Sequence, residues 1–270
     1  MKLNSIILWL AAMIAAGPQL RAEEMPDRSV HSAWTLEWGA ESILDTYLSP
    51  LRYHGTTLGL AASWQKNFTS HPDLWVMHND ASVRGANTLN PAHNARMFDL
   101  DVRYDWGVSR RFTLPHSIQL FAGASAGLQG GVIYLPRNGN NPASAKAEMR
   151  LSLTAGAEWH TRIGRLPLRL TESVRLPSLS AFFSPQYGET YYEIYLGNRN
   201  GLAHCGWWGN HFALDNLLAA DLGLGRTALR IGYRFDARTS WVNNINTQIF
   251  THALVIGVIP GGIGPKIKRQ

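Results

Sequence analysis

The sequence predicts an all-β fold, an antiparallel membrane β-barrel of about eight to ten strands that follows a cleaved signal peptide. Three observations lead to this class. Polar and apolar residues alternate with a period of two along most of the chain, which is typical of strands with one apolar face. The polar faces carry dense mixed charge, and short connections alternate with long ones, as in outer-membrane barrels.

The stretch MKLNSIILWLAAMIAAGPQLRA, residues 1–22, is typical of a secretory signal peptide. Lys2 precedes an apolar core at 6–16, and residues 20–22 resemble a cleavage site. The core is too short to span a bilayer as a helix, and no later run approaches the roughly 20 apolar residues that a spanning helix needs. We therefore expect a signal peptide at 1–22 and an exported mature chain at 23–270.

Composition limits the remaining classes. Removing Lys2 and Arg21 lowers the basic count from 25 to 23 against 19 acids, so the mature net charge is about +4. This weak excess gives no reason to expect a nucleic-acid partner. Cys205 is the only cysteine and cannot form an internal disulfide. No linker or low-complexity tract divides residues 23–270, which indicates a single barrel domain.

Nine candidate strands follow from the alternation. It is strict in WTLEWGAES (34–42), FDLDVRYDWGVSRRF (98–112), KAEMRLSLTAGAEWHTRI (146–163) and TALRIGYRFDARTSW (227–241). In 98–112, for example, Leu100 and Val102 alternate with Asp101 and Arg103. In chain order, the nine candidates are 34–42, 54–68, 98–112, 117–135, 146–163, 166–183, 212–224, 227–241 and 246–259.

Such strands bury one face either in a soluble sandwich with the apolar face inward or in a membrane barrel with that face outward. The charged polar faces favour a hydrated lumen. Aromatic residues also lie on the apolar faces, often toward strand ends, as at membrane interfaces. They include Trp34, Trp38, Trp64, Tyr104, Trp106, Tyr134, Trp159 and Tyr233.

The connections suggest a direction for each strand. Short turns are expected near 114–117, 164–166 and 225–227, and long loops at 69–93, 136–145 and 184–210. With the long loops outside, the strand near His54 runs outward and the last strand runs inward. Eight strands then close a barrel too narrow for an open pore, and the Trp34 strand becomes an extra or covering ninth unless a pair is miscounted.

Glu172 interrupts an apolar face and indicates either a bulge or a lipid-facing carboxylate.

Three stretches carry a resemblance to a known family: TYLSPLRYHG (46–55), GNRNGLAHCGWWGNHFALDN (197–216) and WVNNINTQIFTHALVIG (241–257). They resemble an exported Bacteroidetes family that is known only as a domain of unknown function and is generally taken for an outer-membrane β-barrel. The resemblance covers about 34–259 and implies a bacterial outer-membrane location. It brings no catalytic residues to this chain.

The charged faces contain a candidate lumen site. Glu158, His160 and Arg162 occupy alternate positions of one strand, about 6.6–7 Å apart, so a carboxylate could orient a histidine as general base. The simpler interpretation is an ion-pair network joined across the barrel. The other charged candidates are Arg230, Arg234, Asp236 and Arg238, together with Lys146, Glu148, Arg150, Asp99, Asp101, Arg103 and Asp105.

NRNGLAHCGWWGNH (198–211) supplies the loop candidates His204, Trp207, Trp208 and His211. A metal site with Cys205 would need further ligands, and adjacent His204 and Cys205 rarely converge on one ion, so we expect no metal and no cofactor. The sequence favours an ordered outer loop whose tryptophans anchor the barrel rim. The long loop at 70–94 could bind a ligand or cover the barrel mouth.

These observations favour an outer-membrane protein of a Gram-negative bacterium with a structural or surface-binding role. Its expected partners are membrane lipid and an unidentified surface or periplasmic ligand. One alternative is a hydrolase of lipid or peptide with a Ser-His-acid set, although no nucleophile-elbow or HExxH motif occurs. Another is a narrow selective channel. The hydrolase candidates are His54, His71, His78, His93, His211 and His252, with Ser63, Ser70, Asp73 and Asp80.

Overall fold

The computed structural model describes residues 30–68 and 70–263, so the predicted signal peptide lies outside the described residues. Within these ranges, no helix is long and apolar enough to cross a membrane. The elements are β1 (Val30–Asp45), β2 (Ser49–Asn67), β3 (Trp75–Leu89), β4 (Arg96–Leu114), β5 (Ile118–Tyr134), β6 (Ala143–Ile163), β7 (Leu166–Phe183), α2 (Tyr191–Tyr195), β8 (Ala203–Gly206), β9 (His211–Gly223), β10 (Thr227–Val242) and β11 (Ile245–Pro260).

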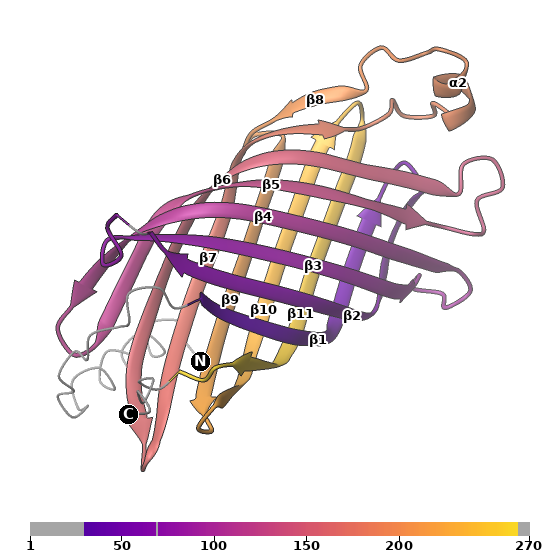
Figure 1. Ribbon diagram of the computed structural model, residues 1–270. Helices are drawn as coiled ribbons and strands as arrows, with labels where there is room; N and C mark the ends of the chain where they lie inside the picture. Colours follow the sequence, from indigo (N-terminus) through magenta and orange to yellow (C-terminus); the bar gives the residue numbers. More distant parts are fainter. Residues whose placement is uncertain (1–29, 69, 264–270) are drawn as a thin grey trace.

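Antiparallel neighbours close the sheet into a barrel (Figure 1). β1 to β7 pair in chain order, β7 then pairs with β9, and β10 and β11 complete the ring. The closing seam joins β1 to β11 from Trp34, opposite Val258, to Asp45, opposite Thr247. The Trp34 strand is therefore a full wall strand rather than an extra or covering one. Across residues 30–68 and 70–263 the wall contains ten strands, the upper limit of the predicted eight to ten.

The predicted long loop at 69–93 is wrong because it contains β3, which pairs with β2 and β4 over most of its length. The alternation of β3 is hidden in the sequence because its outer positions include Asn79, Ala81, Gly85 and Asn87 beside apolar residues. Because residues 75–89 form a strand rather than an outer loop, β2 runs in the direction opposite to the predicted one. The end of β2 lies at the same barrel rim as the turns after β4, β6 and β9.

The two rims differ in their connections. The short-turn rim has the connections 68–74, 115–117, 164–165 and 224–226, together with the start of β1 and the end of β11. The long-loop rim has 46–48, 90–95, 135–142, 184–202 and 243–244. Figure 1 shows the longest of these connections, with α2 and β8, standing above the barrel wall.

The apolar faces point outward, as the sequence predicts for a membrane barrel. Trp34 and Trp38 each expose 60% of their surface, and Met149 exposes 62%. The charged faces point inward, where Asp105 and Asp236 are each 2% exposed. A soluble sandwich would bury the apolar set, so this arrangement contradicts that alternative.

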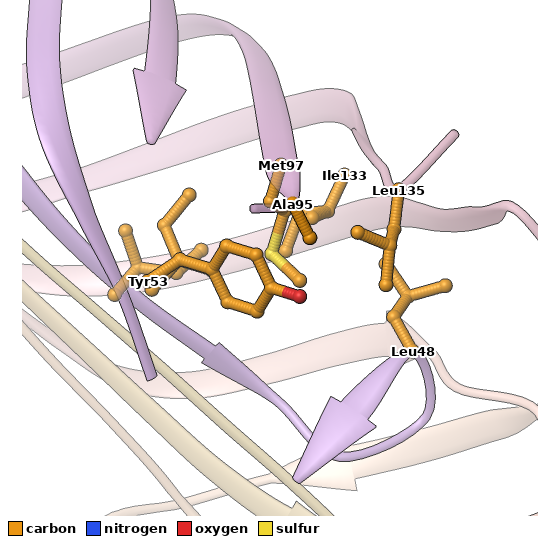
Figure 2. Packing of buried hydrophobic residues seen from close by; sticks show 8 residues of the cluster. Leu48, Tyr53, Ala95, Met97, Ile133 and Leu135 are labelled. Carbon is orange, nitrogen blue, oxygen red and sulfur yellow. The ribbon is translucent and has the colours of Figure 1, made fainter. Parts of the chain in front are cut away.

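Apolar side chains do close one part of the interior. At the long-loop rim, Ile43, Met97 and Ile133 are fully buried and pack with Tyr53 and Leu135 inside the barrel (Figure 2). Leu48 of the first turn joins the same cluster. We call this set, with Ala95 and Ile249, the apolar cap, and it covers part of the lumen below the long loops.

β8 and β9 both pair with β7, one after the other, and the pairing is interrupted between them. Gly206 pairs with Ser180 of β7, and Asp215 pairs with Arg175 further down the same strand. Residues 207–210 between them leave the ladder as a turn. The stretch 198–211 is therefore partly wall, rather than only the descending arm of a loop.

Candidate functional site

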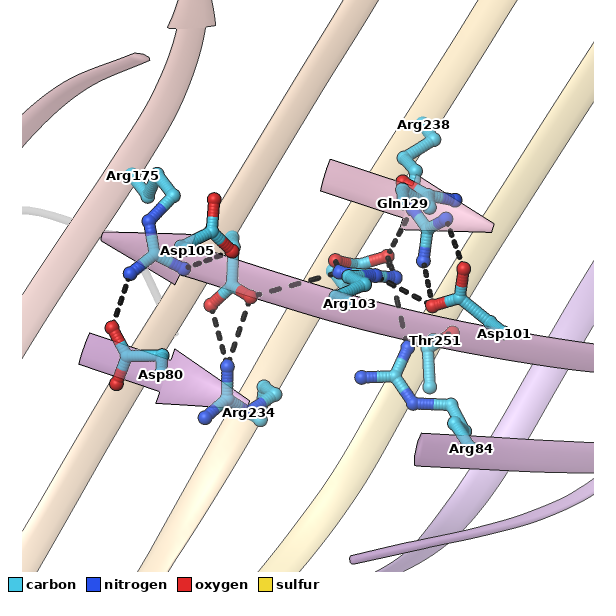
Figure 3. Close-up of polar contacts among 12 residues, drawn as sticks. Asp80, Arg84, Asp101, Arg103, Asp105, Gln129, Arg175, Arg234, Arg238 and Thr251 are labelled. Atoms are coloured by element: carbon cyan, nitrogen blue, oxygen red, sulfur yellow. Dashed lines mark hydrogen bonds and ion pairs between the residues drawn. The ribbon is translucent and has the colours of Figure 1, made fainter. Parts of the chain in front are cut away.

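The middle of the lumen is filled by an ion-pair layer (Figure 3). At its centre, Arg103 Nη1 lies 2.5 Å from Asp236 Oδ2, and its Nε lies 2.5 Å from Asp101 Oδ2. Arg238 contacts the same two carboxylates at 3.0 Å and 3.1 Å. Arg84 approaches Asp236 at 3.7 Å. These side chains come from β3, β4 and β10, so the layer reaches across the barrel.

Further ion pairs extend the layer to the remaining wall. Arg234 bridges Glu37 of β1 and Asp215 of β9, each at 2.8 Å. Asp105 accepts from Arg150 of β6 at 2.8 Å and from Arg175 of β7 at 3.2 Å. Alternate strand positions project these groups inward, where carboxylates and guanidinium groups compensate one another's buried charge. A lumen filled in this way gives no support to the channel alternative.

A cavity of about 150 Å³ lies between the ion-pair layer and the short-turn rim. Glu158, Arg230 and Arg234 from the predicted set line it, together with Arg169. Asp221, which is fully buried, accepts from Arg169 at 2.8 Å and from Arg230 at 2.7 Å. Each of these guanidinium groups therefore already has a carboxylate partner.

The predicted Glu158, His160 and Arg162 constellation is only partly assembled. His160 Nε2 lies 3.4 Å from Glu158 Oε2, and Glu158 also approaches Arg169 at 4.0 Å. Arg162 is exposed at the short-turn rim, and its side chain makes no hydrogen bond or ion pair among the described residues. The structure therefore brings Glu158 and His160 together and leaves Arg162 apart.

Some of the hydrolase candidates also meet in this cavity. Ser63 of β2 stands opposite Asp80 of β3, and His78 lies two residues before Asp80 on the same lumen face. Asp80 is held by Arg175 at 2.5 Å rather than by a histidine. Among the described residues, no hydrogen bond joins Ser63 to His78, so the nucleophile-to-base contact that acyl transfer requires is not formed.

A second, smaller pocket of about 60 Å³ lies on the other side of the ion-pair layer, toward the long loops. The predicted loop residue His211 is in fact the first residue of β9 and lines this pocket with Arg238. Its Nε2 lies 3.6 Å from Glu148 Oε2. Close by, Lys146 contacts buried Asp45 at 2.6 Å.

Among the remaining loop candidates, His204 and Trp208 contact residues of β7 and the loop that follows it. The His204 ring lies beside Phe182, with its Nε2 3.2 Å from the Ser184 carbonyl. Trp208 Nε1 donates to the Pro177 carbonyl at 2.7 Å, so this indole ties the interruption to β7. Trp207 is exposed, as is the thiol-bearing Cys205. Within the described ranges, no group of three His, Cys, Asp or Glu residues could hold a metal ion.

Glu172 does face outward, but it does not mark a bulge. The register shift between β6 and β7 falls opposite Leu151 and Ser152, several residues further along β7. Glu172 Oε1 accepts a hydrogen bond from Asn216 Nδ2 of β9. This hydrogen bond gives the Glu172 carboxylate a polar partner on the outer wall.

The loop at 184–202 contains a short helix that the sequence analysis did not predict. Its helix α2 begins with a capping box, in which Thr190 and Glu193 exchange hydrogen bonds. The Thr190 backbone N–H and hydroxyl lower the pKa of the Glu193 carboxyl. The T-x-x-E spacing at 190–193 was the available signal for this helix.

The same loop is tied to the barrel by hydrogen bonds. Tyr47 Oη of the first turn donates to the Glu189 carbonyl at 2.6 Å, and the Ala145 N–H donates to Tyr191 Oη at 2.6 Å. Burial raises the pKa of both tyrosine hydroxyls, so they stay protonated near neutral pH. Asn243 Nδ2 also donates to the Gly201 carbonyl at 3.1 Å. The loop is thus built onto the barrel at several separate points.

The chain is similar to one known family and to several solved structures. A family described as protein of unknown function (DUF3316) matches residues 4–261. No curated protein matches the chain. The transport unit of the autotransporter AIDA-I from Escherichia coli is similar at 9% identity, with 94% of this chain and 97% of that chain covered and a TM-score of 0.48.

Two further solved structures are similar to the chain. The outer membrane protease OmpT from Escherichia coli is 8% identical, with 89% of this chain and 98% of that chain covered and a TM-score of 0.48. The translocator domain of the autotransporter NalP from Neisseria meningitidis is 9% identical, with 95% of each chain covered and a TM-score of 0.44.

Proposed function

The chain belongs to the DUF3316 family of proteins of unknown function, and from its own geometry we propose an outer-membrane β-barrel protein that binds a partner at the bacterial surface. The loop at 184–202 is the proposed contact surface. A Gram-negative, Bacteroidetes source stays a prediction from the sequence resemblance.

The outer wall supports the membrane part of the proposal. Large apolar side chains that project from the strands at high exposure would be unfavourable in water, at roughly 25 cal/mol per Å². Within the described residues, each of the ten wall strands pairs with a neighbour on both sides, and β8 pairs on one side, so most of the strand backbone is satisfied in lipid. A bilayer therefore fits this wall better than solvent does.

The difference between the rims supports an orientation. Outer-membrane barrels have short turns on the periplasmic side and longer loops outside. By this rule, the short-turn rim faces the periplasm and the long-loop rim faces the exterior. The loop at 184–202 then lies at the cell surface.

The observation that carries the binding role is an exposed aromatic patch on this anchored loop. Tyr195 is 81% exposed, Tyr192 of α2 is exposed as well, and exposed Tyr187 and Leu196 flank the helix. Tyrosine side chains supply contact area at low entropic cost and are enriched at recognition surfaces. Because Tyr47 and Tyr191 anchor the loop from below, binding would order little additional chain.

Cysteine labelling on intact cells tests this arrangement. In a Cys205→Ser background, we expect Tyr195→Cys to react with a membrane-impermeant biotin-maleimide before lysis. Arg226→Cys, in the turn at the short-turn rim, is the matched control and should react only after the outer membrane is permeabilised. The opposite pattern would place the aromatic patch in the periplasm and end the surface-binding proposal.

A further inference from the structure

We propose that the wall has a lateral entrance between β7 and β9, through which a single-chain amphiphile with an amine head reaches the buried carboxylate of Glu148. Three features carry the inference: a break in strand pairing, an apolar mouth on the outer face, and a polar site behind it. The entrance rests on the membrane location of the wall proposed above. It is independent of the surface-binding role of the loop at 184–202.

The pairing between β7 and its neighbour stops within the apolar part of the wall. Arg175 is the last residue of β7 that pairs with β9, and Ser180 is the first that pairs with β8. The interval 176–179, which we call the break, pairs with no described residue of β8 or β9 and spans roughly 13 Å at the rise of a strand. Leu151 and Met149 of β6 are highly exposed at this level and beyond it toward the long-loop rim. The break therefore lies inside the apolar band.

Pro177 and the turn at 207–210 explain why the pairing stops. Proline has no backbone N–H to donate to a strand ladder, and within sheets it is confined to edges and irregularities. The Pro177 carbonyl accepts from the indole of Trp208, so a side chain takes the place of a strand partner. Trp208 is exposed, and exposed side chains change rotamer far faster than paired strands separate. The break can therefore open without unfolding of the wall.

The outer mouth of the break is apolar. Leu179 of β7 and Phe212 of β9 are exposed on its two sides, and the Trp208 indole contacts β7 between them. An alkyl chain in the bilayer thus meets apolar side chains at this point. Such contacts favour the approach of a lipid tail over that of a water-soluble molecule.

The break leads to the smaller pocket of about 60 Å³ inside the barrel. The rings of Phe182 and His211 lie side by side, with centroids 4.8 Å apart, and both line this pocket. A Cβ on Gly206 would lie 2.1 Å from Ser180 Oγ and 3.1 Å from His211 Cβ. Ser180 and His211 therefore flank the point where the pairing stops, and the pocket begins directly behind it.

Glu148 is the residue of this pocket with the weakest ion-pair partner. Its side chain is 7% exposed, and its Oε2 lies 3.6 Å from His211 Nε2. The cations of the pocket, Lys146 and Arg238, bind other carboxylates. Glu148 Oε1 and the Ser180 hydroxyl are buried and make no hydrogen bond within the described ranges.

A primary ammonium group matches this site. It supplies the positive charge that a buried carboxylate needs, and it donates hydrogen bonds to the free oxygens. The pocket of about 60 Å³ exceeds the roughly 30 Å³ share of one water molecule, so it admits a head of this size. A carboxylate head would instead be repelled by Glu148.

Labelling of buried cysteines from the bilayer tests the entrance. The protein, in a Cys205→Ser background, is refolded into phosphatidylcholine vesicles and treated with N-dodecylmaleimide, which partitions into lipid. Ala213→Cys lies beside the break, whereas Ala219→Cys is the matched control, because Ala219 is also buried on β9 but pairs with Thr171 of β7. We expect Ala213→Cys to react about tenfold faster, since reaching Ala219 requires local opening of paired strands. This advantage should vanish with a sulfonated, water-soluble maleimide.

Competition in the same vesicles tests the head group. Dodecylamine should slow the labelling of Ala213→Cys about tenfold, whereas dodecanoate, with a chain of the same length and an anionic head, should not. Glu148→Gln should abolish this protection. Glu172→Gln, which removes an outward carboxylate of β7, is the matched control and should leave the protection unchanged.

Three results would each overturn the proposal: equal labelling of Ala213→Cys and Ala219→Cys, protection by dodecanoate as well, or protection that survives Glu148→Gln. Flotation of the protein with the vesicles is measured separately. A protein that does not float would contradict the membrane location, whereas a floating protein with equal labelling would contradict only the entrance.

Discussion

Asp236→Ala is expected to lower the free energy of unfolding by about 3–5 kcal/mol, because it removes the carboxylate shared by the central arginines of the ion-pair layer. Asp236 is 2% exposed and contacts Arg103, Arg238 and Arg84. Without it, these arginines keep their charge in a buried site and retain only their partners Asp101, Asp215 and Glu37.

Urea unfolding in lipid vesicles, followed by tryptophan fluorescence, measures the change. Asp73→Ala is the matched control, because Asp73 is exposed in the connection between β2 and β3, and its loss should change stability by less than about 0.5 kcal/mol. Equal stabilities of the two variants would mean that water, rather than the ion-pair layer, compensates the charges in the lumen.

Gly39→Ala is expected to prevent closure of the barrel in a large fraction of molecules. A Cβ at Gly39 would lie 1.8 Å from the His252 carbonyl oxygen and 2.6 Å from Ala253 Cα, both backbone atoms of β11. Gly39 sits on the β1 to β11 seam that closes the ring, so the two strands would have to separate there. Such overpacking costs about 3 kcal/mol, and more where only backbone could move.

The folded fraction after refolding into micelles, read from the faster gel mobility of unheated samples, measures this effect. Gly130→Ala is the matched control, since a Cβ at Gly130 would meet no atom within 4 Å. We expect Gly130→Ala to fold as the unmodified protein does. A Gly39→Ala protein with full heat-modifiable mobility would show that the seam tolerates wider spacing.

The wall was predictable from the sequence wherever one face is consistently apolar. In β4 and β6, strict alternation identified both the strand and its outward face, because lipid requires apolar residues along the whole outer face. β3 was not predicted, because Asn79 and Asn87 interrupt the apolar pattern of its outer face. In the structure, Asn79 accepts a hydrogen bond from the Tyr104 hydroxyl of the next strand. A pairwise contact of this kind has no signature in a single sequence.

The lumen was predictable as a class of residues but not as a set of contacts. Alternation placed Arg234, Asp236 and Arg238 inside, yet their partners Asp215, Arg103 and Asp101 depend on strand order and stagger across the barrel. His211 looked like a loop residue because the turn at 207–210 interrupts the strand before it. The anchoring of the loop at 184–202 likewise depends on Tyr47, which is far away in the sequence.

The central claim is that the apolar outer wall faces lipid in the outer membrane. Its most direct test is fractionation of cells that express the full chain, followed by urea washing and gel mobility with and without heating. We expect the protein in the outer-membrane fraction, retained after urea and migrating faster when unheated. A protein recovered in the soluble periplasmic fraction, with the same mobility in both states, would contradict the claim.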